Sequence, residues 1–369
     1  MLPPGDQALL DAIAAGPGEP QRRAVAKAIT LLESTRADHR ARADDFLTAL
    51  PAPEQPAFRL GISGVPGVGK STFIEALGLH LVTAGERVAV LAVDPSSSVS
   101  GGSILGDKTR MDRLSVDASA FVRPSPSGGT LGGVAAATRE AMRVVEAAGY
   151  GVVIVETVGV GQSEAAVAGM TDMFVLLQLP NAGDDLQAIK KGVMELADLV
   201  VVNKADLDAA AAARAVGQIT SALHMASWRA GAAWPPRALA VSALDGGQVA
   251  GVWQLAEAFR EAQRESGAGL ERRRTQALSW FWERIDAGLR QSFRSHAGVR
   301  PQLAETLDAV DAGRMPVTVA ARRLLAAFGG DMGSDIGSDI SADIGADIGA
   351  DIGADDRAAS PPSVATERA

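Results

Sequence analysis

The sequence has no cysteine among its 369 residues. This absence excludes disulfide bonds, thiolate catalysis, and zinc or iron–sulfur centres with cysteine ligands, and it fits the reducing cytosol. Aromatic residues are also scarce, at 4%, whereas hydrophobic residues as a whole make up 47% of the chain. The chain can therefore bury a sizeable core, and that core must be mainly aliphatic.

Long apolar runs are missing as well. No stretch approaches the roughly 18 apolar residues that suggest a membrane span. The first 16 residues include Asp6 and Asp11 but no Lys or Arg, unlike a secretory signal. We therefore expect a cytoplasmic protein with no membrane partner.

A basic surplus, the usual mark of nucleic-acid binding, is absent too. The net charge is −9; between residues 331 and 369, eight Asp and one Glu stand against two Arg, which gives −7, so residues 1–330 carry only −2. We expect no nucleic-acid partner. From 333 to 355 this acidic segment repeats Gly or Ser, a small residue, Asp and Ile every four positions, and we predict disorder because so few Ile cannot offset the ordering of so much Gly and Asp. A calcium-binding repeat is the alternative, but the known nine-residue repeat does not match this period.

Short apolar runs alternate with helical patterns from residue 59 onward. The strand candidates are 59–64, 87–94, 150–157, 172–180, 198–206 and 237–244. The helix candidates are 70–84, 134–148, 184–197, 209–228 and 249–265. Several runs are apolar at consecutive positions, as in strands covered on both faces. The alternation predicts an α/β fold with a mainly parallel sheet flanked by helices.

The first strand candidate leads into the phosphate-binding pattern GxxxxGK[ST], and a helix candidate follows it. Its residues are Gly64, Val65, Pro66, Gly67, Val68, Gly69, Lys70, Ser71 and Thr72. The backbone N–H groups of such a P-loop face phosphates, Lys70 would reach the β- and γ-phosphates, and Ser71 would bind Mg²⁺. An ordinary glycine-rich turn does not explain the full motif in register with strand and helix.

A base-recognition motif follows a later strand candidate. Asp206, in Asn203-Lys204-Ala205-Asp206, can accept two hydrogen bonds from the N1–H and N2–H₂ groups of guanine, which adenine does not offer. A capping Asp before a helix is the alternative, but the P-loop about 130 residues upstream favours guanine. The end of the next strand candidate, Ser242-Ala243-Leu244, would present backbone N–H groups to the guanine O6.

Carboxylates at other strand ends are candidates for the metal and the catalytic switch. Glu156 ends one strand, in Glu-x-x-G where most GTPases have Asp-x-x-G, and the N–H of Gly159 would sense the γ-phosphate. Asp94 ends another strand at the same edge. The long loop 95–111 is either a passive surface loop or a mobile switch that supplies Asp107 or Thr109 to the metal; we prefer the switch.

These segments together resemble the methylmalonyl-CoA mutase-associated GTPases of the MeaB type. The resemblance covers about residues 20–329 and rests on GVPGVGKST, VDPSSSVSGGSILGDKTRM, ETVGVGQSE, QLPNAGDDLQAIKKGVMELAD and NKAD. It implies a P-loop GTPase using GTP, GDP and Mg²⁺, with Lys70, Asp94, Asp107, Glu156 and Lys190 in catalysis. It further implies a homodimer, and a chaperone that gates cofactor loading of an adenosylcobalamin-dependent acyl-CoA mutase and protects that mutase. The segment 179–191 would be an additional switch.

We predict that the chain divides into four parts, the last of which lies outside the family pattern. They are an N-terminal helical extension and linker at 1–57, a P-loop GTPase domain at 58–267, a C-terminal helical dimerisation region at 268–329, and the disordered acidic tail at 330–369.

Three other functions stay open. A kinase linked to amino-acid transport is disfavoured by the guanine-reading Asp206. A nickel metallochaperone is disfavoured because the chain has no Cys and its four His are scattered. A membrane-docking GTPase needs a docking helix, and the only candidate is Arg272–Arg274 beside Trp280–Trp282. We interpret these charges as a solvated helix face and the aromatic residues as dimer or domain packing.

Overall fold

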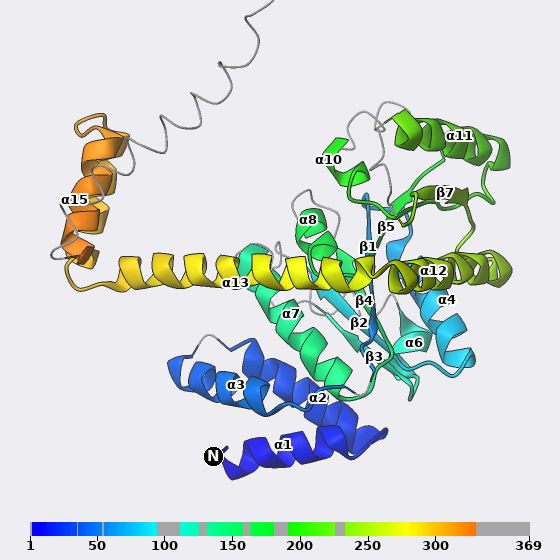
Figure 1. Ribbon diagram of the computed structural model, residues 1–369, viewed down its shortest axis with the longest axis horizontal. Helices are drawn as coiled ribbons and strands as arrows, with labels where there is room; N and C mark the ends of the chain where they lie inside the picture. The colour runs from blue at the N-terminus through cyan, green and yellow to red at the C-terminus, as the bar shows by residue number, and fades with distance from the viewer. Residues whose placement is uncertain are drawn as a thin grey trace, which may run out of the picture. The chain divides into compact units, whose positions relative to one another are not determined.

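The computed structural model describes residues 2–34, 36–53, 55–93, 111–124, 131–157, 163–180, 191–225 and 233–329. The chain divides into two compact units, Met1–Ala277 and Leu278–Ala369. The first unit contains a seven-stranded sheet in which every neighbouring pair is parallel, with helices on both faces (Figure 1). This confirms the predicted α/β class.

The strand order in the sheet is β3-β2-β4-β1-β5-β6-β7. The strands are β1 (Phe58–Gly64), β2 (Val88–Val93), β3 (Ala120–Arg123), β4 (Val152–Thr157), β5 (Met173–Gln178), β6 (Leu199–Val202) and β7 (Arg237–Ala240). All six strand candidates are confirmed, and every residue of β2, β4, β5 and β6 is buried, which explains their unbroken apolar runs. The sequence pattern missed β3, because this edge strand has only four residues and too short an apolar run.

The helices of the first unit cover the two faces of the sheet as separate groups. One face packs against α4 (Lys70–Thr83), α6 (Asp112–Val116) and α12 (Gly246–Ser266). The other packs against α7 (Leu131–Ala147), α8 (Ser163–Ala168) and α11 (Ala209–Met225). The short helices α6 and α10 (Lys191–Met194) differ from the prediction: α6 was not expected, and α10 covers only part of the candidate 184–197, of which 184–190 lies outside the described residues.

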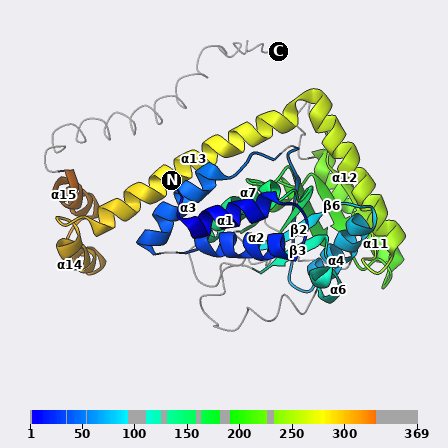
Figure 2. The same cartoon turned by 90° about the horizontal axis from the view of Figure 1, so that it is seen from below.

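Three N-terminal helices join the second group, where α2 contacts α7 (Figure 2). They are α1 (Pro4–Ala14), α2 (Glu19–Leu32) and α3 (Ala37–Ala49). Val25 and Ile29 of α2 are fully buried. Polar contacts fix the same helix, since Gln21 accepts a hydrogen bond of 2.7 Å from Arg87. The Arg87 guanidinium lies 4.2 Å from the ring centre of Tyr150, whose hydroxyl pKa is raised by burial.

Arginines near the start of α13 (Ala268–Ser295) form hydrogen bonds with carboxylates that lie before strands β5 and β6. Arg272 donates to Asp198 at 2.9 and 3.0 Å, and Arg273 donates to Asp172 at 2.6 Å. Each carboxylate also accepts a strand N–H at 2.8 Å, Asp172 from Arg59 and Asp198 from Phe174. The interpretation of this arginine run as a solvated face is therefore wrong for two of its three members, because sequence spacing gave no sign of partners 74 and 101 residues away.

The second unit contains the rest of α13 together with α14 (Arg300–Asp311) and α15 (Val317–Gly329). Phe293 and Phe328 stack edge to face at 5.4 Å between ring centres. Large apolar side chains of this part of α13 are exposed, among them Phe281 at 55% and Trp282 at 62%. In the parts of the chain that the structure describes, no helix has both the length and the hydropathy needed to cross a membrane. The tail 330–369 lies outside the described residues, and the four-part division of the chain stays a prediction.

Candidate functional site

The phosphate loop connects β1 to α4, as the motif predicted. Two of its glycines are fixed by close neighbours. A Cβ on Gly64 would lie 2.6 Å from the carbonyl oxygen of Leu177, and a Cβ on Gly69 would lie 2.8 Å from the side-chain nitrogen of Asn203. Gly69 also has a φ of 93°, which side chains rarely adopt. The loop can therefore pack tightly against β5 and the loop after β6 only with glycine at these positions.

Lys70 is the first residue of α4 and turns its ammonium group back into the phosphate loop. Its Nζ donates to the carbonyl oxygens of Gly64 at 2.7 Å and Val65 at 3.3 Å. The residue is only 9% exposed. A buried cation beside a helix N-terminus makes this loop a favourable place for phosphate.

The structure brings Ser71 and Glu156 together at the edge of the phosphate loop. The Ser71 Oγ donates to the Glu156 Oε1 at 3.3 Å, and Glu156 is 8% exposed at the end of β4. Hydroxyl and carboxylate oxygens are the ligand types that suit Mg²⁺. Within the described ranges, no group of three or more metal-binding side chains is found. Asp94, Asp107 and Gly159 lie outside those ranges, as does Lys190.

Sequence analysis did not identify the hydroxyl pair behind Glu156. The Thr157 Oγ1 donates to the Ser63 Oγ at 2.8 Å, and both side chains are buried. Thr157 is the last residue of β4 and Ser63 is the last but one of β1, so the pair lies directly beside Glu156 and Gly64. The pair therefore fixes the strand that carries the carboxylate against the strand that carries the phosphate loop. The available signal was a hydroxyl residue at the end of each of two apolar strands.

Asn203 joins three separate loops at the same edge of the sheet. Its Nδ2 donates to the Val68 carbonyl at 2.8 Å, and its Oδ1 accepts from the Ala243 N–H at 3.1 Å. Lys204 has a φ of 60° and donates from Nζ to the Gly67 carbonyl at 2.8 Å. The phosphate loop, the NKAD segment and the Ser242–Leu244 segment thus form one connected surface.

Asp206 is exposed on this surface, in a loop anchored by a 3.1 Å hydrogen bond from the Ala205 N–H to the Val241 carbonyl. Leu244 is likewise exposed, whereas Ser242 and Ala243 are buried. A carboxylate and neighbouring backbone donors therefore lie on adjacent loops, next to the phosphate loop. The side chain of Gln248, which the sequence did not single out, contacts Ser242 and Asp245 beside the same surface.

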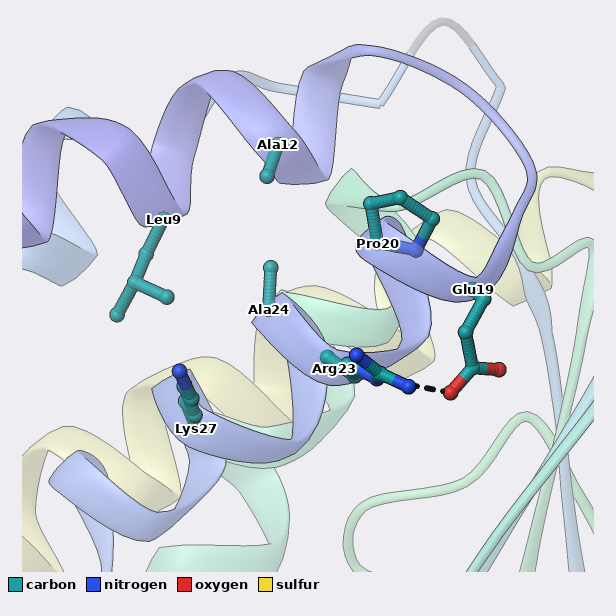
Figure 3. Close-up of a pocket in the computed structure, with 7 residues that line it drawn as sticks. All are labelled: Leu9, Ala12, Glu19, Pro20, Arg23, Ala24 and Lys27. Atoms are coloured by element: carbon teal, nitrogen blue, oxygen red, sulfur yellow. Dashed lines mark hydrogen bonds and ion pairs between the residues drawn. The ribbon is translucent and has the colours of Figure 1, made fainter.

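A separate cavity of about 410 Å³ lies between α1 and α2 (Figure 3). Its lining residues are Leu9, Ala12, Glu19, Pro20, Arg23, Ala24 and Lys27. The Glu19–Arg23 ion pair at 3.0 Å is exposed on both sides. The cavity is lined by none of the predicted site residues, so the chemistry expected from the motifs belongs to the carboxyl edge of the sheet.

A parallel sheet whose first strand leads through GVPGVGKS into a helix defines a P-loop nucleoside triphosphatase. The family model described as "Methylmalonyl Co-A mutase-associated GTPase MeaB" matches residues 25–297. The chain belongs to this family, and it is a GTPase.

Relatives from distant organisms agree with this placement. The GTPase ArgK of Escherichia coli K12 is 49% identical over 262 residues, which are 71% of this chain and 79% of that protein. A mouse protein named methylmalonic aciduria type A homolog, mitochondrial, is 43% identical over 334 residues, which are 88% of this chain and 80% of that protein. A crystal structure described as an LAO/AO transport system kinase matches with a TM-score of 0.69 and 35% identity, over 88% of this chain and 98% of that one.

Proposed function

We propose that this GTPase is a chaperone of an adenosylcobalamin-dependent acyl-CoA mutase of the methylmalonyl-CoA mutase type. It gates loading of the cofactor into the mutase and protects the mutase from inactivation. The observation that carries the proposal is the family match, whose description names association with methylmalonyl-CoA mutase. The mouse relative, named after methylmalonic aciduria, supports the same partner class.

The site supports guanine nucleotide binding with defined roles. In this proposal, Asp206 accepts hydrogen bonds from the guanine N1–H and N2–H₂, the Ser242–Leu244 backbone meets O6, and the glycine-rich loop holds the phosphates. Lys70 exchanges its carbonyl partners for the β- and γ-phosphates, because both are oxygen acceptors at the same end of α4. Placing a cation there stabilises the charge that develops during phosphoryl transfer.

Magnesium fits the Ser71–Glu156 pair as a hard cation held by oxygen ligands. Bound there, it would neutralise phosphate charge. Ser71 would bind it directly and Glu156 through water, while Asp94 and Asp107 are proposed as further carboxylates. We propose that the N–H of Gly159 senses the γ-phosphate. Lys190 or Lys191 would approach the nucleotide when the mutase binds.

Homodimerisation is part of the same proposal. Large apolar side chains of α13 are exposed at helical spacing, at Leu278, Phe281, Trp282 and Leu289. An exposed apolar stripe on one helix is typical of a surface covered by another chain. We propose that a second copy covers it, within a protein that works in the cytoplasm.

The name of the solved relative suggests a second candidate function, a kinase linked to transport. A kinase transfers the γ-phosphate to an acceptor, whereas a GTPase releases inorganic phosphate. With γ-labelled GTP, the family assignment predicts label in inorganic phosphate alone. Label on an amino-acid-binding protein would favour the kinase.

The central test measures GTP turnover with and without an adenosylcobalamin-dependent acyl-CoA mutase from the source cell. We expect slow basal turnover and strong stimulation by the mutase, because a partner that supplies positive charge can accelerate GTP hydrolysis by orders of magnitude. A variant with alanine at Lys190 and Lys191 should keep basal turnover and lose most of the stimulation; Lys27→Ala, in the α1–α2 cavity, is the matched control. Absence of stimulation of the wild type by any such mutase would refute the proposed partner.

A further inference from the structure

Helix α12 begins with a capping arrangement that departs from the usual one. Asp245 is the N-cap, and its Oδ1 accepts from the N–H groups of Gly247 at 2.9 Å and Gln248 at 3.3 Å. The spacing Asp-x-x-Gln is that of a capping box, in which the third helical residue normally bonds the N-cap N–H. Here the Asp245 N–H instead donates to the Ser242 carbonyl at 3.0 Å. The carboxamide of Gln248 is therefore free to bond elsewhere.

The Gln248 carboxamide instead bonds the Ser242–Leu244 segment, which is proposed to meet the guanine O6. Its Oε1 accepts from the Ser242 N–H at 2.7 Å, and its Nε2 donates to the Asp245 Oδ2 at 2.9 Å. A flipped amide would face an N–H with its own donor and a carboxylate with its own acceptor, so these two partners define the orientation. The carboxamide is thus held through both its oxygen and its nitrogen, although the residue is exposed.

The three successive N–H groups of this loop have unequal partners. Ser242 donates to Gln248 at 2.7 Å, Ala243 to the Asn203 Oδ1 at 3.1 Å, and Leu244 to the Ser242 Oγ at 3.3 Å. The first two distances lie within the normal range for N–H···O hydrogen bonds, whereas the third lies beyond it. Gln248 and Asn203 therefore occupy the N–H groups of Ser242 and Ala243, which leaves the N–H of Leu244 as the donor that a base oxygen can recruit.

The loop is consequently clamped from two sides, by Asn203 of the NKAD segment after β6 and by Gln248 of α12. We infer that Gln248 is a positioning residue for guanine recognition: it fixes the Ser242–Leu244 turn so that the Leu244 N–H meets the O6 of the base. This inference rests on the proposed assignment of that loop to the base. A residue that only caps α12 would contribute to helix stability and leave nucleotide affinity unchanged.

The test compares Gln248→Met with wild type in calorimetric titrations with GDP, IDP and ADP. Methionine keeps the length of the side chain but makes neither hydrogen bond. We expect GDP binding to weaken about fivefold, which corresponds to about 1 kcal/mol. IDP should weaken by the same factor, because inosine keeps O6 and lacks only the 2-amino group. In turnover assays KM should rise while kcat at saturating GTP stays within twofold, since Lys70, Ser71 and Glu156 are untouched.

Gln254→Met is the matched control, because this glutamine is an exposed residue of the same helix. It should bind GDP and IDP as tightly as the wild type does. Asp206→Asn provides the contrast, since it should change the ratio of GDP to IDP affinity, whereas Gln248→Met should not. Gln248→Ala, measured in parallel, guards against an effect peculiar to methionine.

Two results would overturn the inference in distinguishable ways. If Gln248→Met lowers the melting temperature but binds GDP like the wild type, Gln248 is a helix cap and only the inference fails. If the wild type binds ADP as tightly as GDP, the assignment of the base pocket fails, and the inference fails with it.

Discussion

The two edges of the parallel sheet are held together by different kinds of bond. At the carboxyl edge, Lys70, Asn203 and Lys204 donate hydrogen bonds to backbone carbonyls of the phosphate loop. At the amino edge, arginines donate pairs of hydrogen bonds to carboxylates: Arg59 to Glu146 at 2.6 and 2.9 Å, and Arg272 to Asp198 at 2.9 and 3.0 Å.

This difference matches what each edge has to do. A lysine bonded to a carbonyl oxygen can exchange it for a phosphate oxygen, because both are acceptors. A paired arginine–carboxylate contact is charge-assisted and geometrically specific, so it resists rearrangement. The ligand-binding edge is therefore built to exchange partners, while the opposite edge fixes the strands from which the loops emerge.

The largest effect is expected at the carboxyl edge, from Lys70→Ala. Loss of the ammonium group should lower GTP turnover by about 1000-fold, since it removes charge stabilisation during phosphoryl transfer. Phosphate release at saturating GTP measures this, with Lys27→Ala as the control that removes an exposed lysine. Turnover within tenfold of wild type would show that the exchangeable lysine is not the phosphate-binding group.

A smaller effect is expected at the amino edge, from Asp172→Asn. The change weakens the contact with Arg273 and the bond from the Arg59 N–H, so the free energy of unfolding should fall by about 2–3 kcal/mol. Chemical denaturation measures it. Glu19→Gln, which breaks an exposed pair with Arg23, should cost less than about 1 kcal/mol. The GDP affinity of Asp172→Asn should stay within twofold of that of the wild type. A larger loss would show that the amino edge also contributes to nucleotide binding.

The smallest effect is expected from Asp206→Asn, again at the carboxyl edge. GDP binding should weaken about tenfold, or about 1.4 kcal/mol, while binding of xanthosine diphosphate should improve. Stability should change by less than about 0.5 kcal/mol, because the side chain is exposed. Calorimetric titration and thermal melting together check both parts. Unchanged GDP affinity would show that Asp206 does not bind the guanine base.

Much of the fold was predictable from the sequence, and each exception has a physical reason. Strands buried on both faces produce contiguous apolar runs, so six of the seven were found, whereas the four-residue edge strand β3 lacks such a run. The phosphate loop and the NKAD segment were recognisable because the functional residues of each motif lie close together in the sequence. Gln248 and the Thr157–Ser63 pair were missed because a single polar residue carries no pattern of its own.

The sequence by itself determined the local chemistry of this protein: the phosphate loop, the NKAD segment and the apolar strands that lead to them. Only the tertiary structure decided which of these parts meet. Asn203 bonds Val68, 135 positions away, and Ala243, 40 positions away. Arg272 and Arg273 have carboxylate partners 74 and 101 positions away. Periodicity and motifs describe neighbours along the chain, whereas these partners are set by strand order, which places remote segments at a common edge of the sheet.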